Sequence, residues 1–295
     1  MDLVCTLLGV ALIALALRDI FDVLFHPLGR GLIAQRVVRG VAALARRRPG
    51  RKGIGLLAGP ISFVAVVATW AALLALGWAL VFLPQLPQGF HFDPGLDPAQ
   101  HSGFLDALYV SLVNLTSLGY GDISPASSVL RILGPVETLL GLGLLTASIS
   151  WLLSIYGAIS RRDSLADEVH LVKEAEERLG EKLADADPGL LATLLAGFSE
   201  QLIRARRDLI HFPIVHYFRT EDEERALAGL LPFLSSLADE AGEEDRPPSL
   251  RVRAEILRMA IDDFAETLRR RLKMPGETTE ETLRQYQSDH GPLRA

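Results

Sequence analysis

The sequence predicts an all-α protein in two parts, membrane helices followed by a helical domain in water, and its composition and charge distribution carry that prediction. The 295 residues are 49% hydrophobic and 22% charged, with a formal net charge of −6. Apolar runs crowd the first part of the chain, whereas acidic residues dominate beyond residue 163. A chain divided in this way faces two solvents, and it offers no basic surface interleaved with aromatic residues of the kind that binds nucleic acid.

The first predicted element is a hydrophobic helix over residues 1–27. Its apolar run gives way to Arg18, Asp19 and Asp22. A helix needs about 20 apolar residues to cross a bilayer, so two alternatives stay open: the segment spans the membrane, or it lies partly at the interface. A basic loop is expected to follow over residues 28–55.

Two further segments are predicted to span the membrane. The outer one, over 56–83, contains no charged residue, and the inner one, over 127–160, stops at a pair of arginines. Between them lie an outer loop, 84–103, and an apolar segment, 104–115. At about a dozen residues this last segment is too short to cross, and its length suits a helix that enters the membrane and returns.

The distribution of basic residues predicts the orientation. The loop between the first two helices holds eight of them: Arg30, Arg36, Arg39, Arg46, Arg47, Arg48, Arg51 and Lys52. The loop 84–103 has neither lysine nor arginine. Because loops rich in lysine and arginine stay on the cytoplasmic side, we expect the basic loop and everything past residue 160 to be cytoplasmic.

Residues 161–273 are predicted to form a cytoplasmic helical domain, because apolar residues recur there at helical spacing. One example is the run formed by Leu165, Val169 and Val172. Residues 274–295 are polar and are expected to form a flexible tail.

The most informative segment follows the short apolar helix and reads Thr-Ser-Leu-Gly-Tyr-Gly-Asp over residues 116–122. Irregular backbone at membrane depth is tolerated only where it is buried in protein or lines a water-filled cavity. Gly119 and Gly121 permit a positive φ, so successive carbonyl groups can turn to one side. A ring of such carbonyls can replace the hydration shell of a cation.

This segment, within a frame over residues 56–160, resembles the potassium-channel pore family and especially its bacterial members with two membrane helices. The resemblance implies a potassium-selective channel in the cell membrane, with K⁺ as the permeant ion and no enzyme activity, cofactor or other metal. One filter in each chain requires about four chains around one pore, so the expected partners are three further copies of the chain and the lipid bilayer. The resemblance assigns the pore helix and filter to residues 104–122.

The ion-binding residues implied by the resemblance are Thr116, Ser117, Leu118, Gly119, Tyr120 and Gly121. Carried over by position, the carbonyl oxygens from Ser117 to Tyr120, with the Ser117 hydroxyl, would form the successive ion sites. Tyr120 would point away from the pore and pack on the pore helix, and Asp122 would concentrate cations at the outer mouth.

The sequence departs from the family pattern at two positions. Ser117 stands where the family usually has threonine, and Leu118 where it usually has valine, so we expect selectivity to survive with a looser innermost site. Val113 occupies the position where some relatives have a buried acid behind the filter. We expect Asn114 or Glu137 to supply the missing polar contact.

Gly141 and Gly143 lie in the predicted inner helix, and two interpretations of them stay open. They form the hinge at which this helix bends when the channel opens, or they allow close packing between membrane helices.

Two other functions compete with a channel. Subunits of potassium-uptake transporters use the same frame, but they carry several degenerate repeats in one chain, and one is present here. A membrane-anchored sensor or enzyme would need a functional tail. The tail contains no G-x-G-x-x-G, G-x-x-x-x-G-K-[ST], H-E-x-x-H or C-x-x-C motif. A regulatory ligand for the cytoplasmic domain remains an expectation without a motif that identifies it.

Overall fold

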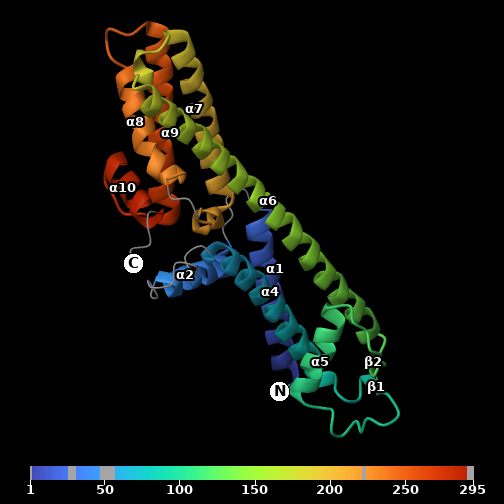
Figure 1. The fold of residues 1–295 in the computed structure, drawn as a ribbon. Helices are drawn as coiled ribbons and strands as arrows, with labels where there is room; N and C mark the ends of the chain where they lie inside the picture. Colours follow the sequence, from blue (N-terminus) through green and yellow to red (C-terminus); the bar gives the residue numbers. More distant parts are fainter. Residues whose placement is uncertain (1, 26–30, 47–56, 221–223, 291–295) are drawn as a thin grey trace. The chain divides into compact units, whose positions relative to one another are not determined.

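The protein is built mainly of helices (Figure 1). The computed structural model describes residues 2–25, 31–46, 57–220 and 224–290. The chain divides into two compact units. The first unit is formed by Met1–Val38 and Phe63–Leu153, and the second by Arg39–Ser62 and Ser154–Ala295.

Among the described residues, three helices are long and apolar enough to cross a membrane, as predicted. They are α1 (Asp2–Leu24), α4 (Ala58–Phe82) and α6 (Leu130–Leu179). The short apolar helix α5 (Phe104–Leu115) lies between the last two in sequence. The bounds of α4 differ by no more than two residues from those expected for the outer helix, which is the ordinary uncertainty of helix ends.

Helix α1 packs directly against α4, and two glycines allow the close approach. A Cβ atom on Gly9 would lie 2.5 Å from the carbonyl oxygen of Gly77, and a Cβ on Gly77 would lie 2.9 Å from that of Gly9. Small residues at such a crossing let two backbones meet, and this is how membrane helices commonly associate. The N-terminal helix is therefore an integral part of the first unit.

The basic segment expected as a loop over 28–55 contains a helix, α2 (Leu32–Arg46). This is a correction to the prediction. The segment 32–46 has no proline, and its apolar residues recur at helical spacing, with Ala34, Val38 and Ala42 buried. The arginines indicated the side of the membrane, but they do not disfavour a helix.

A buried aspartate on α1 holds the start of α2. The Asp19 carboxylate accepts hydrogen bonds from the backbone N–H groups of Ile33 at 2.8 Å and Ala34 at 3.0 Å. It also accepts one from the indole N–H of Trp70 on α4 at 2.8 Å. These donors satisfy a charge that would otherwise be costly to bury. The centre of the Trp70 ring in turn lies 5.6 Å from that of the Trp151 ring on α6. Asp19 and these two rings therefore link α1, α2, α4 and α6.

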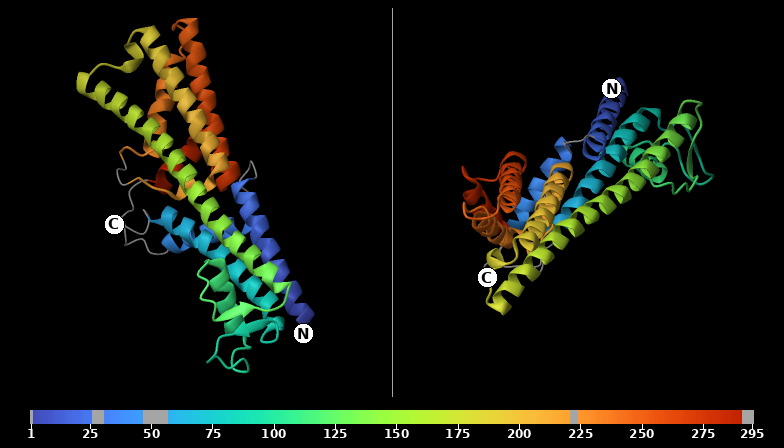
Figure 2. Two further views of the ribbon diagram at one scale, coloured as in Figure 1. Left: turned by 90° about the vertical axis from the view of Figure 1, so that its right-hand side faces the viewer. Right: turned by 90° about the horizontal axis from the view of Figure 1, so that it is seen from above.

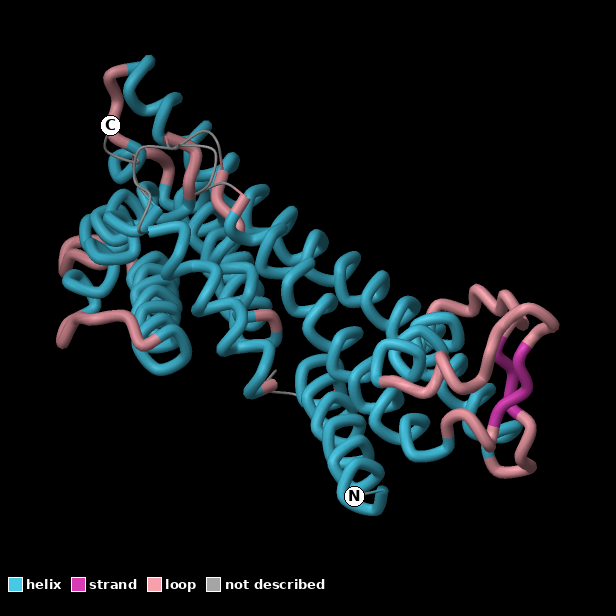
Figure 3. The backbone as a smooth tube through the Cα atoms, turned by 90° about the horizontal axis from the view of Figure 1, so that it is seen from below, coloured by secondary structure: helices cyan, strands magenta, loops and turns pink. Residues whose placement is uncertain are grey.

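A small antiparallel ladder was not foreseen by the all-α prediction. Strand β1 (Phe90–Phe92) pairs with β2 (Ile123–Pro125), and His91 lies opposite Ser124 (Figure 3). The first strand belongs to the outer loop, and the second directly follows the predicted filter. Strands of three residues lack the length from which an alternating pattern can be recognised.

Helix α6 is one continuous helix of 50 residues, whereas the inner helix was expected to end at residue 160. The sequence from Ala158 to Leu179 contains neither glycine nor proline. Arginine is a good helix former, so Arg161 and Arg162 mark a change of surroundings and not a helix end.

The second unit is organised around a hydrophobic core. Helices α7 (Pro188–His211) and α9 (Pro248–Leu272) lie side by side, and α8 (Leu227–Ala241) packs against α9 (Figure 2). The short 3-10 helices in this unit are η2 (Leu183–Asp185) and η3 (Pro213–Tyr217). The face of α7 in the core consists of residues at helical spacing that are fully buried: Leu191, Leu195, Phe198 and Leu202.

The tail expected to be flexible over 274–295 contains helix α10 (Thr279–His290). The N–H of Glu281 donates to the Thr278 hydroxyl at 3.2 Å, and the Glu281 carboxylate accepts from the N–H of Glu277 at 2.9 Å. This is close to a capping box, a pattern that starts helices in otherwise polar sequence. Residues 291–295 lie outside the described part of the chain.

Candidate functional site

The predicted filter, residues 116–122, begins in a turn that ends α5. The N–H of Ser117 donates to the carbonyl of Asn114, and that of Leu118 to the carbonyl of Val113, both at 3.0 Å. Ser117 has a φ of 60°. Together these features form a Schellman motif, in which the left-handed residue is usually glycine. A non-glycine residue in this conformation costs about 1–2 kcal/mol, so the helix end stores strain at the first residue of the turn.

Positive φ values stand at every second residue of the predicted filter. They are 60° at Ser117, 59° at Gly119 and 81° at Gly121. This alternation lets successive carbonyl oxygens face one side of the segment. A Cβ atom on Gly119 or Gly121 would meet nothing within 4 Å. The glycines are therefore required for backbone conformation and not for space.

A fully buried carboxyl group on α6 holds the rear of α5. The Glu137 carboxyl lies 2.5 Å from the hydroxyl of Ser111 and 3.1 Å from the side-chain nitrogen of Asn114, both of which donate to it. The Ser111 hydroxyl also lies 3.0 Å from the carbonyl oxygen of Ala75, and the Thr138 hydroxyl donates to the Asn114 carbonyl at 3.0 Å. The two residues considered for support of the filter are thus brought together.

Sequence reasoning missed Ser111 in this group. It lies three residues before Asn114, and residues three apart lie on the same face of a helix. That spacing of two polar side chains within an apolar helix was the available signal.

The two glycines of the inner helix have different surroundings. A Cβ atom on Gly141 would lie 1.9 Å from the carbonyl oxygen of Leu115, the last residue of α5. A Cβ on Gly143 would meet nothing within 4 Å. Gly141 therefore serves close packing against the end of α5, and α6 is helical through both positions. Whether either one acts as a hinge stays a prediction.

Asp122, at the far end of the predicted filter, is tied to two other segments. Its carboxylate accepts a hydrogen bond from the hydroxyl of Tyr109 on α5 at 2.7 Å. Its carbonyl accepts one from the N–H of Asp93 in the outer loop at 2.9 Å. With the ladder between β1 and β2, these bonds attach the end of the segment to the outer loop. Tyr109 had not been singled out from the sequence.

Two side chains of the predicted filter are exposed in the single chain. Leu118 is 54% exposed and Tyr120 is 67% exposed. The expected packing of Tyr120 on the pore helix is not formed within one chain and stays a prediction. Residues of another molecule would have to cover it.

The site presents oxygen atoms and negative charge. The carboxyl end of α5, which carries the negative end of the helix dipole, leads directly into residues 116–122. The outer loop contributes no lysine or arginine. Carbonyl and carboxylate oxygens are ligands that hard cations prefer. No cluster of three or more metal-ligating side chains occurs among the residues with described positions.

Comparison with known proteins agrees with this geometry. Residues 63–157 match the model of the family described as an ion channel, a range that includes α5, residues 116–122 and Glu137. An uncharacterized membrane protein, YdjJ of Bacillus subtilis (strain 168), is 24% identical to this chain over 226 residues. That similarity covers 75% of this chain and 64% of the relative, so the chain spans less than two thirds of the relative's length. No solved structure matches the chain.

The apolar helices and the family match together define the class of protein. The chain has three helices long and apolar enough to cross a membrane among its described residues, and residues 63–157 match the ion-channel family.

Proposed function

We propose that this chain is one subunit of a potassium-selective channel that conducts K⁺ passively across the cell membrane. The observation that carries the proposal is the run of positive φ values at Ser117, Gly119 and Gly121, directly after a helix too short to span the membrane. In such a backbone, a row of carbonyl oxygens can face one side, where these oxygens alone would coordinate an ion.

The chemistry of selection follows from those oxygens. Carbonyls from Ser117 to Tyr120 replace the water around K⁺, and the Ser117 hydroxyl contributes at the innermost site. Asp122 attracts cations to the outer mouth. The hydrogen bonds of Glu137 with Ser111 and Asn114 hold the pore helix, so the carbonyl positions are kept when an ion leaves.

Four copies of the chain would surround one pore, because a single segment supplies only one side of an ion site. Exposed apolar side chains support this arrangement. Besides Leu118 and Tyr120, α6 exposes large apolar side chains along its length: Ile132, Val136, Leu139, Leu145, Ile149 and Leu153. Neighbouring subunits and lipid would cover these surfaces.

The orientation proposed here follows the basic residues. The segment 30–52 and the helical unit formed by α7 to α10 face the cytoplasm, and the outer loop with β1 faces outward. The helical unit would then be the part accessible to cytoplasmic regulators.

Recording from purified protein in a planar bilayer tests the proposal, with K⁺ on one side and Na⁺ on the other. We expect a reversal potential close to that of potassium. Gly119→Ala, which forces a residue with a side chain into a φ of 59°, should abolish the selective current. Gly197→Ala on α7 is the matched control, because its added Cβ also meets nothing within 4 Å in the chain.

Three outcomes would contradict the proposal. A reversal potential near zero would reject potassium selectivity while leaving an ion channel. Unchanged selectivity in Gly119→Ala would reject the assigned filter. Native mass spectrometry that finds only monomers in a detergent that preserves the fold would reject the tetramer.

A further inference from the structure

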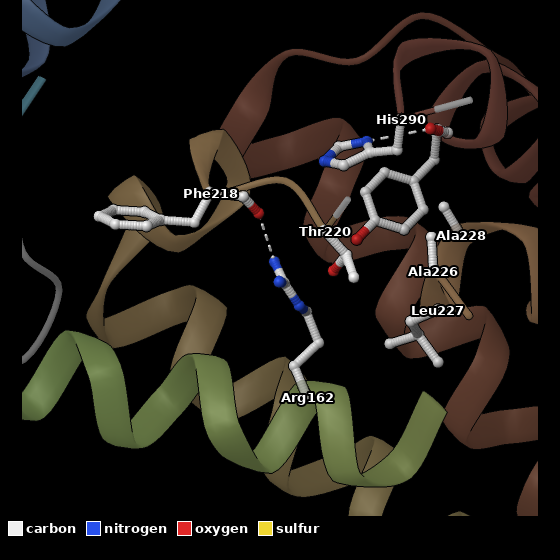
Figure 4. A pocket seen from close by; sticks show the side chains of 8 residues that line it. Arg162, Phe218, Thr220, Ala226, Leu227, Ala228 and His290 are labelled. Atoms are coloured by element: carbon white, nitrogen blue, oxygen red, sulfur yellow. Dashed lines mark hydrogen bonds between the residues drawn. The ribbon is translucent and has the colours of Figure 1, made fainter. Parts of the chain in front are cut away.

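A small cavity lies inside the helical unit. It has a volume of about 10 Å³, which is room for roughly one water-sized particle. Figure 4 shows its wall, to which α6, α8, α10 and the segment before α8 each contribute. The lining residues that matter below are Arg162, Thr220, Leu227, Ala228, Tyr286 and His290.

The Tyr286 hydroxyl is a donor without an acceptor. The residue is only 4% exposed, its ring contacts His216, Phe264 and His290, and no described residue accepts a hydrogen bond from its hydroxyl. The phenol oxygen lies within electrostatic reach of both Arg162 and its ion-pair partner Asp163 on α6. A hydroxyl on a residue buried to this extent normally has a partner.

Arg162 also keeps a free donor. Its guanidinium has five N–H groups. Two of them reach the carbonyl oxygens of Val215 and Phe218 at 3.3 and 2.8 Å, and two face the carboxylate of Asp163 at 3.0 and 2.9 Å. At least one N–H is left for a ligand.

The start of α8 supplies further donors at the same cavity. The N-cap residue of α8, Ala226, has no side chain that could accept from the first N–H groups of the helix. Leu227 and Ala228, the first two residues of α8, both line the cavity. The N-terminus of a helix carries a partial positive charge and binds anions. The Thr220 hydroxyl, which also has no acceptor among the described residues, lines the same space.

We propose that this cavity binds one monovalent anion of the size of chloride. Donors from Arg162, Thr220, Tyr286 and the first turn of α8 would surround it, and none of the described residues that line the cavity is acidic. The volume of about 10 Å³ favours a small ion over phosphate and sulfate. A chloride ion would accept hydrogen bonds from several donors at once. These donors would include the guanidinium N–H of Arg162 that does not face Asp163 or a carbonyl group.

The surrounding charges agree with an anion. His290 also lines the cavity, and its ring nitrogens lie 2.9 and 3.1 Å from the carbonyl oxygens of His216 and Tyr286. Burial lowers the pKa of His290, and the charges of Arg219 and Arg162 lower it further. The same positive potential that disfavours a protonated imidazole favours a negative ion.

Such an anion would join three helices. Arg162 belongs to α6, the helix that also carries Glu137 and Gly141, whereas Tyr286 belongs to α10 and Leu227 begins α8. Occupancy would stabilise the docking of α10 by mass action. This inference concerns binding and does not depend on the conduction proposed above.

The test is the thermal stability of the purified full-length protein in chloride or bromide, compared with gluconate at the same ionic strength. We expect the midpoint of unfolding of the helical unit to rise by several degrees in either halide. Tyr286→Phe and Thr220→Val should each reduce that rise at least twofold. The control is Thr193→Val, which removes an exposed hydroxyl on α7 that bonds to its own helix at 2.9 Å.

A crystal grown in bromide gives the direct answer. An anomalous peak beside Arg162 and Tyr286, absent from Tyr286→Phe, would establish the site. Equal midpoints in chloride and gluconate, a rise that persists unchanged in Tyr286→Phe, or water alone in the bromide crystal would overturn the proposal. Stabilisation by phosphate but not by halide would overturn the size argument on which it rests.

Discussion

The surroundings of the predicted filter and the core of the helical unit are stabilised in different ways. Around the filter, Ala107 and Val110 of α5 pack in a smaller apolar cluster. The carboxyl end of α5 is positioned chiefly by directional contacts, the hydrogen bonds of Glu137 and the close approach of Gly141 to Leu115. In the helical unit, leucines and alanines from α6 to α10 form one continuous apolar cluster, with Phe198 among its largest members.

This difference predicts how substitutions in each region affect conduction and folding stability. Hydrogen bonds and backbone contacts depend steeply on geometry, so losing one displaces what it holds. Burial of apolar surface is non-directional and sums over many side chains, so a core loses stability gradually. Changes near the filter should therefore affect conduction more than folding, and changes in the helical core should do the opposite.

The largest effect is expected from Gly141→Ala. The new Cβ would lie 1.9 Å from the carbonyl oxygen of Leu115, a distance at which backbone must move. The end of α5 and the filter that follows would shift, and potassium-selective current should be lost. Single-channel recording measures this. Gly197→Ala on α7, whose added Cβ meets nothing within 4 Å, should conduct normally. Normal current in Gly141→Ala would show that the filter does not depend on this contact.

A large change in stability is expected from Phe198→Ala, which empties part of the helical core. Replacing a buried phenylalanine by alanine costs about 3–5 kcal/mol. Denaturant unfolding of the purified protein should report this loss, whereas the reversal potential of channels that remain folded should be unchanged. Phe198→Leu is the milder control. An altered reversal potential would break the proposed separation between the two regions.

A smaller effect is expected from Glu137→Ala, which removes the acceptor for Ser111 and Asn114. Leaving buried donors unsatisfied costs about 1–3 kcal/mol. The permeability ratio of K⁺ to Na⁺ should fall because the pore helix is held less firmly, and Glu137→Gln, which keeps one acceptor oxygen, should lie between. If alanine and the wild type gave equal ratios and equal thermal midpoints, Glu137 would have no supporting role.

The smallest effect is a pH dependence confined to the helical unit. Burial lowers the pKa of His290 below its ordinary value of about 6.5, so the folded state favours the neutral ring. The associated stability is fully present above that value, and it is lost as the pH falls from there through the lowered pKa. Unfolding measured between pH 7 and 5 should show this loss.

His290→Gln should flatten that dependence. His211→Gln, at an exposed position on α7, should leave it unchanged. An identical dependence on pH in the wild type and His290→Gln would show that another group is responsible.

Several parts of this protein could be predicted from the chain alone because their causes are local. The three apolar helices and the half-length of α5 follow from hydrophobic length. The positive φ values at Gly119 and Gly121 follow from the glycines themselves. The role of α10 was missed although Thr278 and Glu281 carried a capping pattern, since the polar composition suggested a flexible tail.

Other features required the fold because their causes join distant residues. Asp19 caps a helix 13 residues away and meets Trp70, and Gly141 meets Leu115 across two helices. The left-handed Ser117 depends on how α5 ends, which no residue preference indicates. The sequence by itself determined which segments form long apolar helices and where glycines permit a positive φ, since these depend on composition and local conformation. Only the tertiary structure decided which polar groups and which glycines meet, because hydrogen bonding and close packing act between positions that sequence order does not bring together.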